Sequence, residues 1–152
     1  MKANVENKIM TGLNFDDGKK GFPVNGDLNR MIYFNPSDVN LYDRITKASE
    51  DIISALEIIP ASLKDEVESG KLETDEAVKT VDLVQRKIKE ALNYMLDSDC
   101  YDTIFGNTSP LTPVNGEFLI NGVMEGLTNL IVAESGKDME KLNKKLSKYK
   151  TK

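Results

Sequence analysis

Few side chains in this chain of 152 residues could do chemistry on a substrate, because it has one cysteine, Cys100, and no histidine. The missing histidine excludes a serine or cysteine nucleophile activated by histidine, and it excludes a zinc-binding histidine pair on a helix. The single cysteine excludes an internal disulfide and a cluster of thiolate ligands. Nothing next to Cys100 in the sequence would lower its thiol pKa, so we interpret it as a small, partly buried side chain.

Two aspartates could begin a calcium-binding loop, because Asp97 and Asp99 have the spacing of its first two ligands. The pattern then fails, since Tyr101, Asp102 and Thr108 stand where a third oxygen ligand, a glycine and a bidentate glutamate belong. We therefore interpret this segment as the end of a helix followed by a turn. The sequence predicts neither a metal site nor another cofactor site.

Three glycines near two lysines are the remaining candidate for ligand chemistry, as a phosphate cradle. Gly18, Gly21 and Gly26 lie around Lys19 and Lys20. Their spacing matches neither the phosphate-binding loop of nucleotide hydrolases nor the glycine pattern of dinucleotide-binding folds, and hairpin turns are the simpler interpretation. With no nucleophile–base pair and no metal-ligand set, we expect that the protein is not an enzyme.

The charge is divided unevenly along the chain, whose net charge is −5. Residues 137–152, the basic tail, hold seven lysines and two acidic residues, whereas the rest of the chain holds 13 basic and 23 acidic residues. The acidic body argues against nucleic-acid binding, and the aromatic residues are not interleaved with basic ones. Three interpretations of the basic tail stay open: it attracts an acidic partner, folds onto the body, or ends as a solvated helix.

No segment has the apolarity of a secretory signal or of a membrane span. The first ten residues lack an apolar core, and the longest purely aliphatic run covers only residues 130–133. A membrane helix needs about 20 apolar residues. We therefore expect a soluble protein of the cytoplasm with no membrane partner, and a lone cysteine fits that reducing compartment.

Two long helices are predicted from apolar residues that recur at alternating intervals of four and three positions, on one helical face. The first helix is expected to begin with Asn35 as its cap and Pro36 in its first turn, and to end at Pro60. The second is expected to begin at Thr74 or Asp75, and the two faces favour antiparallel packing. The stripes are Leu41, Ile45, Ala48, Ile52, Ala55 and Ile59 in the first helix, and Ala77, Val81, Val84, Ile88, Ala91 and Met95 in the second.

Short elements are expected between and before these helices. The Asn25-Gly26 pair predicts a small β-hairpin, with residues 13–15 and 30–34 as its strands. Two short helical segments are predicted as well, at 62–69 and 100–104.

A third long helix is expected to open at residues 115–117 and to break at Gly136, before the basic tail. Inside it, Gly122 and Gly126 lie four positions apart. Each glycine costs a helix about 1 kcal/mol relative to alanine, and close contact with another helix would compensate. Its apolar side is formed by Phe118, Leu119, Val123, Met124, Leu127, Leu130 and Ile131.

The predicted fold is mainly α, with three to four principal helices in a compact bundle and a small N-terminal β-hairpin. No linker rich in proline, glycine or serine divides the chain, so residues 1–152 are expected to form a single domain. Residues 1–12 and 137–152 are the candidates for flexible ends.

The order of short motifs carries a family resemblance. The hairpin leads into Asn35-Pro36-Ser37-Asp38, a later loop contains Phe105-Gly106-Asn107, and a further helix with a lysine-rich end closes the chain. This layout resembles the tail assembly chaperones of long-tailed bacteriophages and prophages of Gram-positive bacteria. The resemblance implies a non-enzymatic protein that binds the tape-measure protein, and as a second candidate the tail-tube protein, during assembly in the host cytoplasm. It also implies absence from the finished virion.

A small, non-catalytic helical adaptor or regulatory protein with an unrelated protein partner is the alternative hypothesis. In both cases the function rests on surface contacts, and the loop of residues 105–114 and the basic tail are the candidate surfaces. A homo-oligomer stays open. The expected contact residues are Phe105, Leu111, Lys141, Lys144, Lys145 and Lys148.

Overall fold

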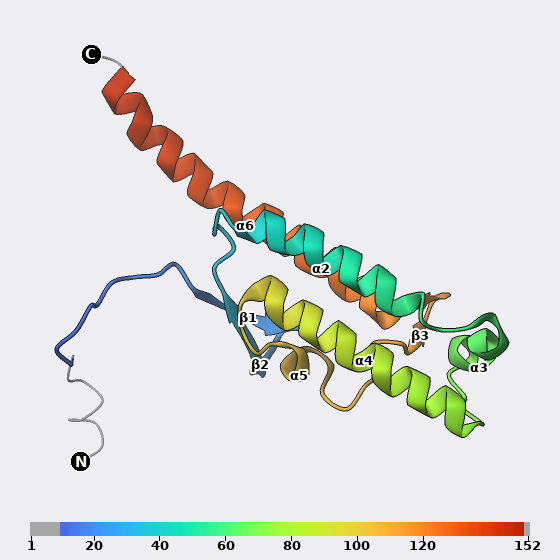
Figure 1. Cartoon of the computed structure of the whole chain (residues 1–152). Helices are drawn as coiled ribbons and strands as arrows, with labels where there is room; N and C mark the ends of the chain where they lie inside the picture. The colour runs from blue at the N-terminus through green and yellow to red at the C-terminus, as the bar shows by residue number, and fades with distance from the viewer. Residues whose placement is uncertain (1–9, 151–152) are drawn as a thin grey trace.

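The protein is mainly helical and carries a small antiparallel β-hairpin near its N-terminus, as the sequence predicted (Figure 1). The computed structural model describes the backbone of residues 10–150 and the side chains of residues 10–145. The long helices are α2 (Leu41–Leu56), α4 (Asp75–Leu96) and α6 (Leu119–Lys150). Helices α2 and α4 run in opposite directions, and α6 passes behind α2 and continues beyond it (Figure 1).

The predicted hairpin is confirmed around its turn, but its first strand begins later than expected. Strands β1 (Lys20–Val24) and β2 (Asp27–Phe34) pair antiparallel, and both residues of the Asn25-Gly26 turn have positive φ, 51° and 74°. That geometry matches the twist of the strands and favours Asn-Gly. Residues 13–15 are not a strand, because the carboxylates of Asp16 and Asp17 bind the backbone N–H groups two residues on and turn the chain before β1.

The first long helix begins at Leu41, so the prediction of a helix start at Asn35 was wrong. The Asn35 carboxamide oxygen accepts a hydrogen bond from the backbone N–H of Ser37 at 2.9 Å. The Asp38 carboxylate accepts one from the backbone N–H of Asn40, also at 2.9 Å. Side chains that bond their own backbone two residues on favour turns over helix, and two such turns in succession delay the helix.

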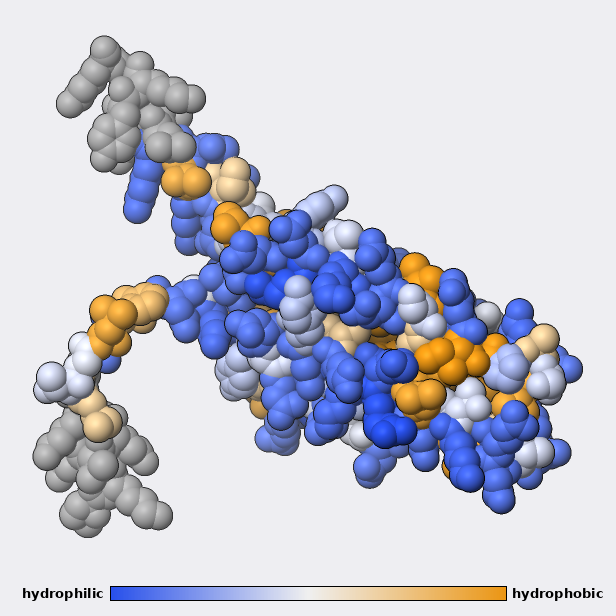
Figure 2. All heavy atoms as spheres, in the orientation of Figure 1, coloured by the Kyte–Doolittle hydropathy of each residue, from blue (hydrophilic) through white to orange (hydrophobic). Residues whose placement is uncertain are grey.

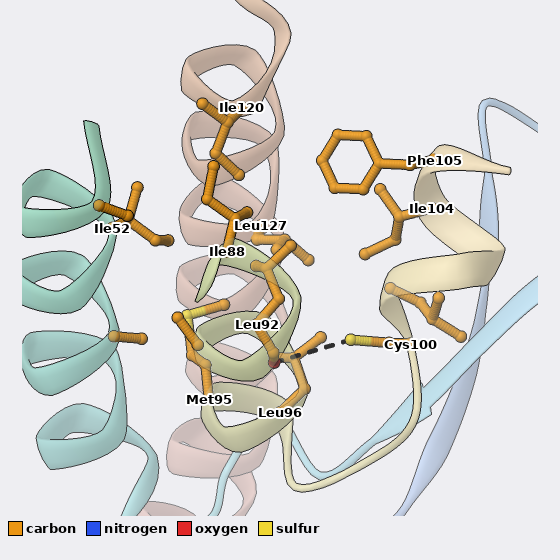
Figure 3. Packing of buried hydrophobic residues seen from close by; sticks show 14 of the residues in the cluster. Ile52, Ile88, Leu92, Met95, Leu96, Cys100, Ile104, Phe105, Ile120 and Leu127 are labelled. Atoms are coloured by element: carbon orange, nitrogen blue, oxygen red, sulfur yellow. Dashed lines mark hydrogen bonds between the residues drawn. The ribbon is translucent and has the colours of Figure 1, made fainter. Parts of the chain in front are cut away.

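The predicted stripes of α2 and α4 form the centre of the core. Thr74 caps α4, with its hydroxyl accepting from the backbone N–H of Ala77 at 3.1 Å. Figure 3 shows Ile88 and Leu92 of α4 between Ile52 of α2 and the buried residues of α5, with α6 passing behind. The buried stripe residues are Leu41, Ala48, Ile52 and Ala55 in α2, and Ala77, Val81, Val84, Ile88, Ala91 and Met95 in α4. Antiparallel packing of the two predicted helices is confirmed.

Short helical segments stand where they were expected. The 3-10 turn η1 (Ala61–Leu63) and helix α3 (Lys64–Ser69) precede Gly70, whose left-handed conformation with φ of 74° ends α3. Helix α5 (Tyr101–Phe105) follows α4.

The third long helix does not open at residues 115–117, because Asn115-Gly116 is the turn of a second hairpin. Its strands are β3 (Pro113–Val114) and β4 (Glu117–Phe118), and the turn residues have φ values of 51° and 83°. Helix α6 begins after this hairpin at Leu119. The same dipeptide therefore makes the same left-handed turn twice in this chain.

Helix α6 also passes through Gly136 without a break, contrary to prediction. Glu134 and Lys137 form an ion pair across this point with an O–N distance of 2.5 Å. Asp138 accepts a hydrogen bond from the Ser37 hydroxyl and lies 3.7 Å from the ammonium of Lys20. These ties hold the helix on both sides of the glycine, so the basic tail is helical through Lys150. Residues 1–9 and 151–152, part of the predicted flexible ends, lie outside the described residues.

Asn93, near the end of α4, fixes the chain that follows. Its side-chain oxygen accepts hydrogen bonds from the backbone N–H groups of Cys100 and Tyr101, at 3.0 and 2.9 Å. Its amide nitrogen donates to Asp99 at 3.2 Å. One side chain thus replaces the missing helical partners of the first amides of α5.

We expect the Asn93→Ala substitution to lower the free energy of unfolding by about 1–3 kcal/mol, because it removes the side-chain acceptor of two partly buried N–H groups. The Cys100 N–H keeps the Ser98 carbonyl at 3.0 Å, so most of the loss comes from the Tyr101 N–H. Urea denaturation followed by circular dichroism measures the change. The matched control is Asn129→Ala, at an exposed position of α6. Equal stabilities of the two variants would contradict the role given to Asn93.

Candidate partner-binding surfaces

Cys100 and Asp97, which by sequence were candidates for chemistry, have structural roles in the fold. The Cys100 side chain is 2% exposed and its sulfur contacts the Leu92 carbonyl oxygen at 3.7 Å (Figure 3). Burial raises the pKa of the Cys100 thiol to about 11. Asp97 ends α4 in a left-handed conformation with φ of 50°, as the prediction of a helix end required. In the described part of the chain, no three acidic or cysteine side chains are grouped to hold a metal ion.

The predicted contact residues fall into a buried set and an exposed set. Phe105 and Leu111 are each 4% exposed, so Leu111 belongs to the core rather than to an accessible loop surface. Lys141, Lys144 and Lys145 are exposed on α6. The helix also contains Lys148, whose side chain lies outside the described residues.

A groove of about 660 Å³, lined by apolar side chains together with Asn25, Arg30 and Thr108, lies between the N-terminal hairpin, α5 and the first half of α6. Its volume is within the range of small-molecule and peptide pockets, about 300–1,000 Å³. Phe105 forms part of its wall. We call this surface the hairpin groove, and its other apolar residues are Phe22, Val24, Ile32, Ile104, Leu119, Val123, Leu127 and Leu130.

Arg30 holds two walls of the hairpin groove in place. From β2, its guanidinium donates to the backbone carbonyl of Thr103 at 3.2 Å and to that of Ile104 at 2.5 Å. These carbonyls lie at the end of α5, where the helix leaves them without an internal partner. A cation at a helix C-terminus is also favoured by the helix dipole.

Two glycines border the hairpin groove where the sequence predicted close helix contact. A Cβ atom built on Gly122 or on Gly126 would meet nothing within 4 Å. The prediction that close contact with another helix compensates for the helix-destabilising effect of these two glycines is therefore wrong. Both residues line the groove instead, and their missing side chains leave it open.

The last part of α6 projects beyond the body of the protein (Figure 1). Asp138 contacts two residues on the hairpin side of the body, Ser37 and Lys20. The hydrogen bond from Ser37 and the nearby lysine cations hold the pKa of Asp138 below its ordinary value. Beyond this point Met139 is 54% exposed and Leu142 is 48% exposed.

We call residues 139–145 the α6 tip. Three of its members are lysines, Lys141, Lys144 and Lys145, and one is an acid, Glu140. Apolar and hydrophilic side chains alternate along this projecting part of the helix (Figure 2). The tip therefore combines uncovered apolar surface with positive charge, which is the composition of a contact surface for an acidic partner.

Comparison with protein-family models, with curated proteins and with solved structures gave no match to this chain. Within residues 10–150, no helix is both long enough and apolar enough to cross a membrane.

We expect Gly122→Ala and Gly126→Ala each to stabilise the protein by about 0.5–1 kcal/mol, because the new methyl group meets no other atom and alanine favours the helix. Thermal denaturation measures the gain. Gly26→Ala is the control, since its φ of 74° opposes any Cβ, and it should destabilise. A loss of stability in both helix variants would show that the groove is closed in solution.

We also expect Cys100 to stay unmodified by Ellman's reagent at about pH 8, because its thiol is buried and its pKa of about 11 keeps it protonated. The reaction is followed by the absorbance of the coloured thiolate that the reagent releases. Addition of denaturant should release the full signal, which is the internal control. Modification of the native protein at the rate of a free thiol would contradict the buried position.

Proposed function

We propose that this protein is a non-enzymatic binding protein that covers apolar helical surface on another protein chain. The observation that carries the proposal is the α6 tip, where Met139 and Leu142 stand about half exposed on a helix that has left the body. Contiguous exposed apolar surface marks sites of contact with other proteins, and Met139 and Leu142 lie next to each other, one turn apart on the helix. Lysines beside them add long-range attraction for acidic chains.

The hairpin groove is a second surface that supports this proposal. Most of the residues that line it are apolar. It is bordered by Gly122 and Gly126, where the methyl group of an alanine would meet no other atom within 4 Å. An amphipathic helix laid into an apolar groove is a common mode of peptide recognition. A binding protein with a projecting helix and a groove can hold a long client at more than one point.

The specific form of the proposal is a tail assembly chaperone of a bacteriophage or prophage. It rests on the motif order from the hairpin through Asn35-Pro36-Ser37-Asp38 to Phe105-Gly106-Asn107 and the lysine-rich last helix. The client would be the tape-measure protein, and the tail-tube protein is the second candidate. A long helical client exposes apolar stripes until it is packed in the tail, and temporary cover would keep it from aggregating. The place of action would be the host cytoplasm, before the virion is complete.

The alternative is a small helical adaptor whose partner has no part in tail assembly. The same two surfaces support it, because their chemistry does not depend on the origin of the partner. The two proposals differ in the identity of the client and in the genes that lie nearby.

Co-expression with the long helix-rich protein encoded nearest downstream tests the chaperone proposal. We expect that protein to stay in the soluble fraction and to co-purify with this one, because its apolar stripes are covered. Expression of the client alone, and with the unrelated helical bundle cytochrome b562, are the controls. A client that is equally soluble in all three cases and does not co-purify would contradict the chaperone form and leave the adaptor.

A further inference from the structure

We propose that the α6 tip binds an acidic amphipathic helix of its client, lying alongside it as in a two-stranded coiled coil. This inference rests on the proposed function and gives the partner its chemistry. The evidence is the placement of apolar and charged residues along one projecting helix.

The apolar edge of the tip continues the line with which α6 packs on the body. Ile131 is 9% exposed, and Asp138 contacts Ser37 and Lys20 of the body. Leu142 lies four residues after Asp138, so it occupies the same side of the helix one turn further on. Met139 lies three residues before Leu142 and extends this edge. The body does not reach so far, and both side chains are left about half exposed.

Lysines border that edge along one side. Lys145 lies three residues after Leu142, and Lys141 lies four residues before Lys145, so both belong to the row next to the apolar edge. Glu140 and Lys144 lie two residues before and two residues after Leu142, spacings that place both on the opposite face. In the described part of the chain, neither of the lysines beside the edge, Lys141 and Lys145, forms an ion pair.

Charge decides between a second copy of this chain and a different partner. Two α6 tips laid side by side would bring like-charged lysines together, which opposes pairing. Glu140 lies on the face opposite Leu142, and the two acids that precede the tip are engaged within the chain: Asp138 with Ser37 and Lys20, and Glu134 with Lys137. A partner helix with leucine-like residues on one edge and carboxylates beside them fits both features of the tip. Its approach would also be accelerated by the opposite charge.

Two synthetic helices of about four heptads test this chemistry. Both carry leucine at the apolar positions, and the flanking positions are all glutamate in one peptide and all lysine in the other. Like charges keep each peptide from pairing with itself. We expect the full-length protein to bind the fluorescently labelled glutamate peptide at least about tenfold more tightly than the lysine peptide. Raising the salt from about 0.05 to 0.5 M should weaken this binding.

Charge reversal of the tip supplies the decisive variant. Lys141→Glu with Lys145→Glu should invert the preference, so that the lysine peptide binds more tightly. The matched control reverses Lys64 and Lys71, which are exposed on the body, and should retain the original preference. Met139→Ser with Leu142→Ser should abolish binding of both peptides, while circular dichroism reports that the body stays folded.

Binding of both peptides with equal affinity, or of neither by the folded protein, would overturn the inference. So would a concentration-dependent dimer in sedimentation that is lost in the Met139→Ser, Leu142→Ser variant, because the tip would then pair with a second copy. The proposed function is tested separately by the natural client. If the client co-purifies equally well with the charge-reversed protein, the proposed function is retained and the inference that the tip binds an acidic helix is contradicted. If the protein binds the glutamate peptide but no client, the inference is retained and the proposed function is contradicted.

Discussion

Burial of the apolar face of α4 is the constraint on which the rest of the structure depends. Ile88 and Leu92 are 0% exposed, and covering them requires α2 on one side, α5 on the other and α6 behind (Figure 3). Each fully buried aliphatic side chain contributes about 1.5–3 kcal/mol, so this face outweighs any local preference in the connecting segments. The chain after α4 must turn back at once to bring Cys100 and α5 onto the same face.

That turn leaves backbone N–H and C=O groups at the two ends of α5 without helical partners. Side chains from other segments must bond them, and these bonds fix the position of α5 as a wall of the hairpin groove. Asn93 receives the first amides of α5, and Arg30 donates to its last carbonyls, at 2.5 and 3.2 Å. At the end of α4, Arg44 donates to the Met95 carbonyl at 3.0 Å and pairs with Asp38. The bonds of Arg30 to α5 and of Arg44 to Met95 link elements that are distant in the sequence, whereas those of Asn93 and Asp38 are local. The walls of the groove are therefore set by capping as much as by apolar packing, and a bulkier residue at Gly126 would change its shape without disturbing those ties.

The two long helices α2 and α4 could be predicted because apolar residues spaced alternately by four and three positions lie on one face of a helix, and that face is buried. The prediction is confirmed for the apolar stripes that contain Ile52 and Ile88. It failed at junctions, where two local signals compete: Asn115-Gly116 was assigned to a helix start although the same dipeptide at residues 25–26 correctly predicted a turn. The prediction of a helix break at Gly136 was wrong because contacts on both sides of the glycine hold the helix together. They are the ion pair of Glu134 with Lys137 and the hydrogen bond of Asp138 with Ser37, which a local glycine signal does not reveal. The groove joins three distant segments, which no spacing rule reveals. The exposed lysines of the tip were foreseen from charge alone, whereas the projection that exposes Met139 and Leu142 was not.

A helix that projects from its support has few sources of stability. Isolated helices shorter than about 12–15 residues are marginal in water, and in proteins most helical stability comes from packing of an apolar face. The α6 tip lacks that packing, and Lys141 and Lys145, four residues apart, repel each other along its surface. An acidic helix alongside would cover Leu142 and turn that repulsion into attraction, so binding and helix stability would increase together. Under the proposed function, the free protein would carry a segment that is most stable when bound, which would be a physical reason for the helix to continue beyond the body that holds it.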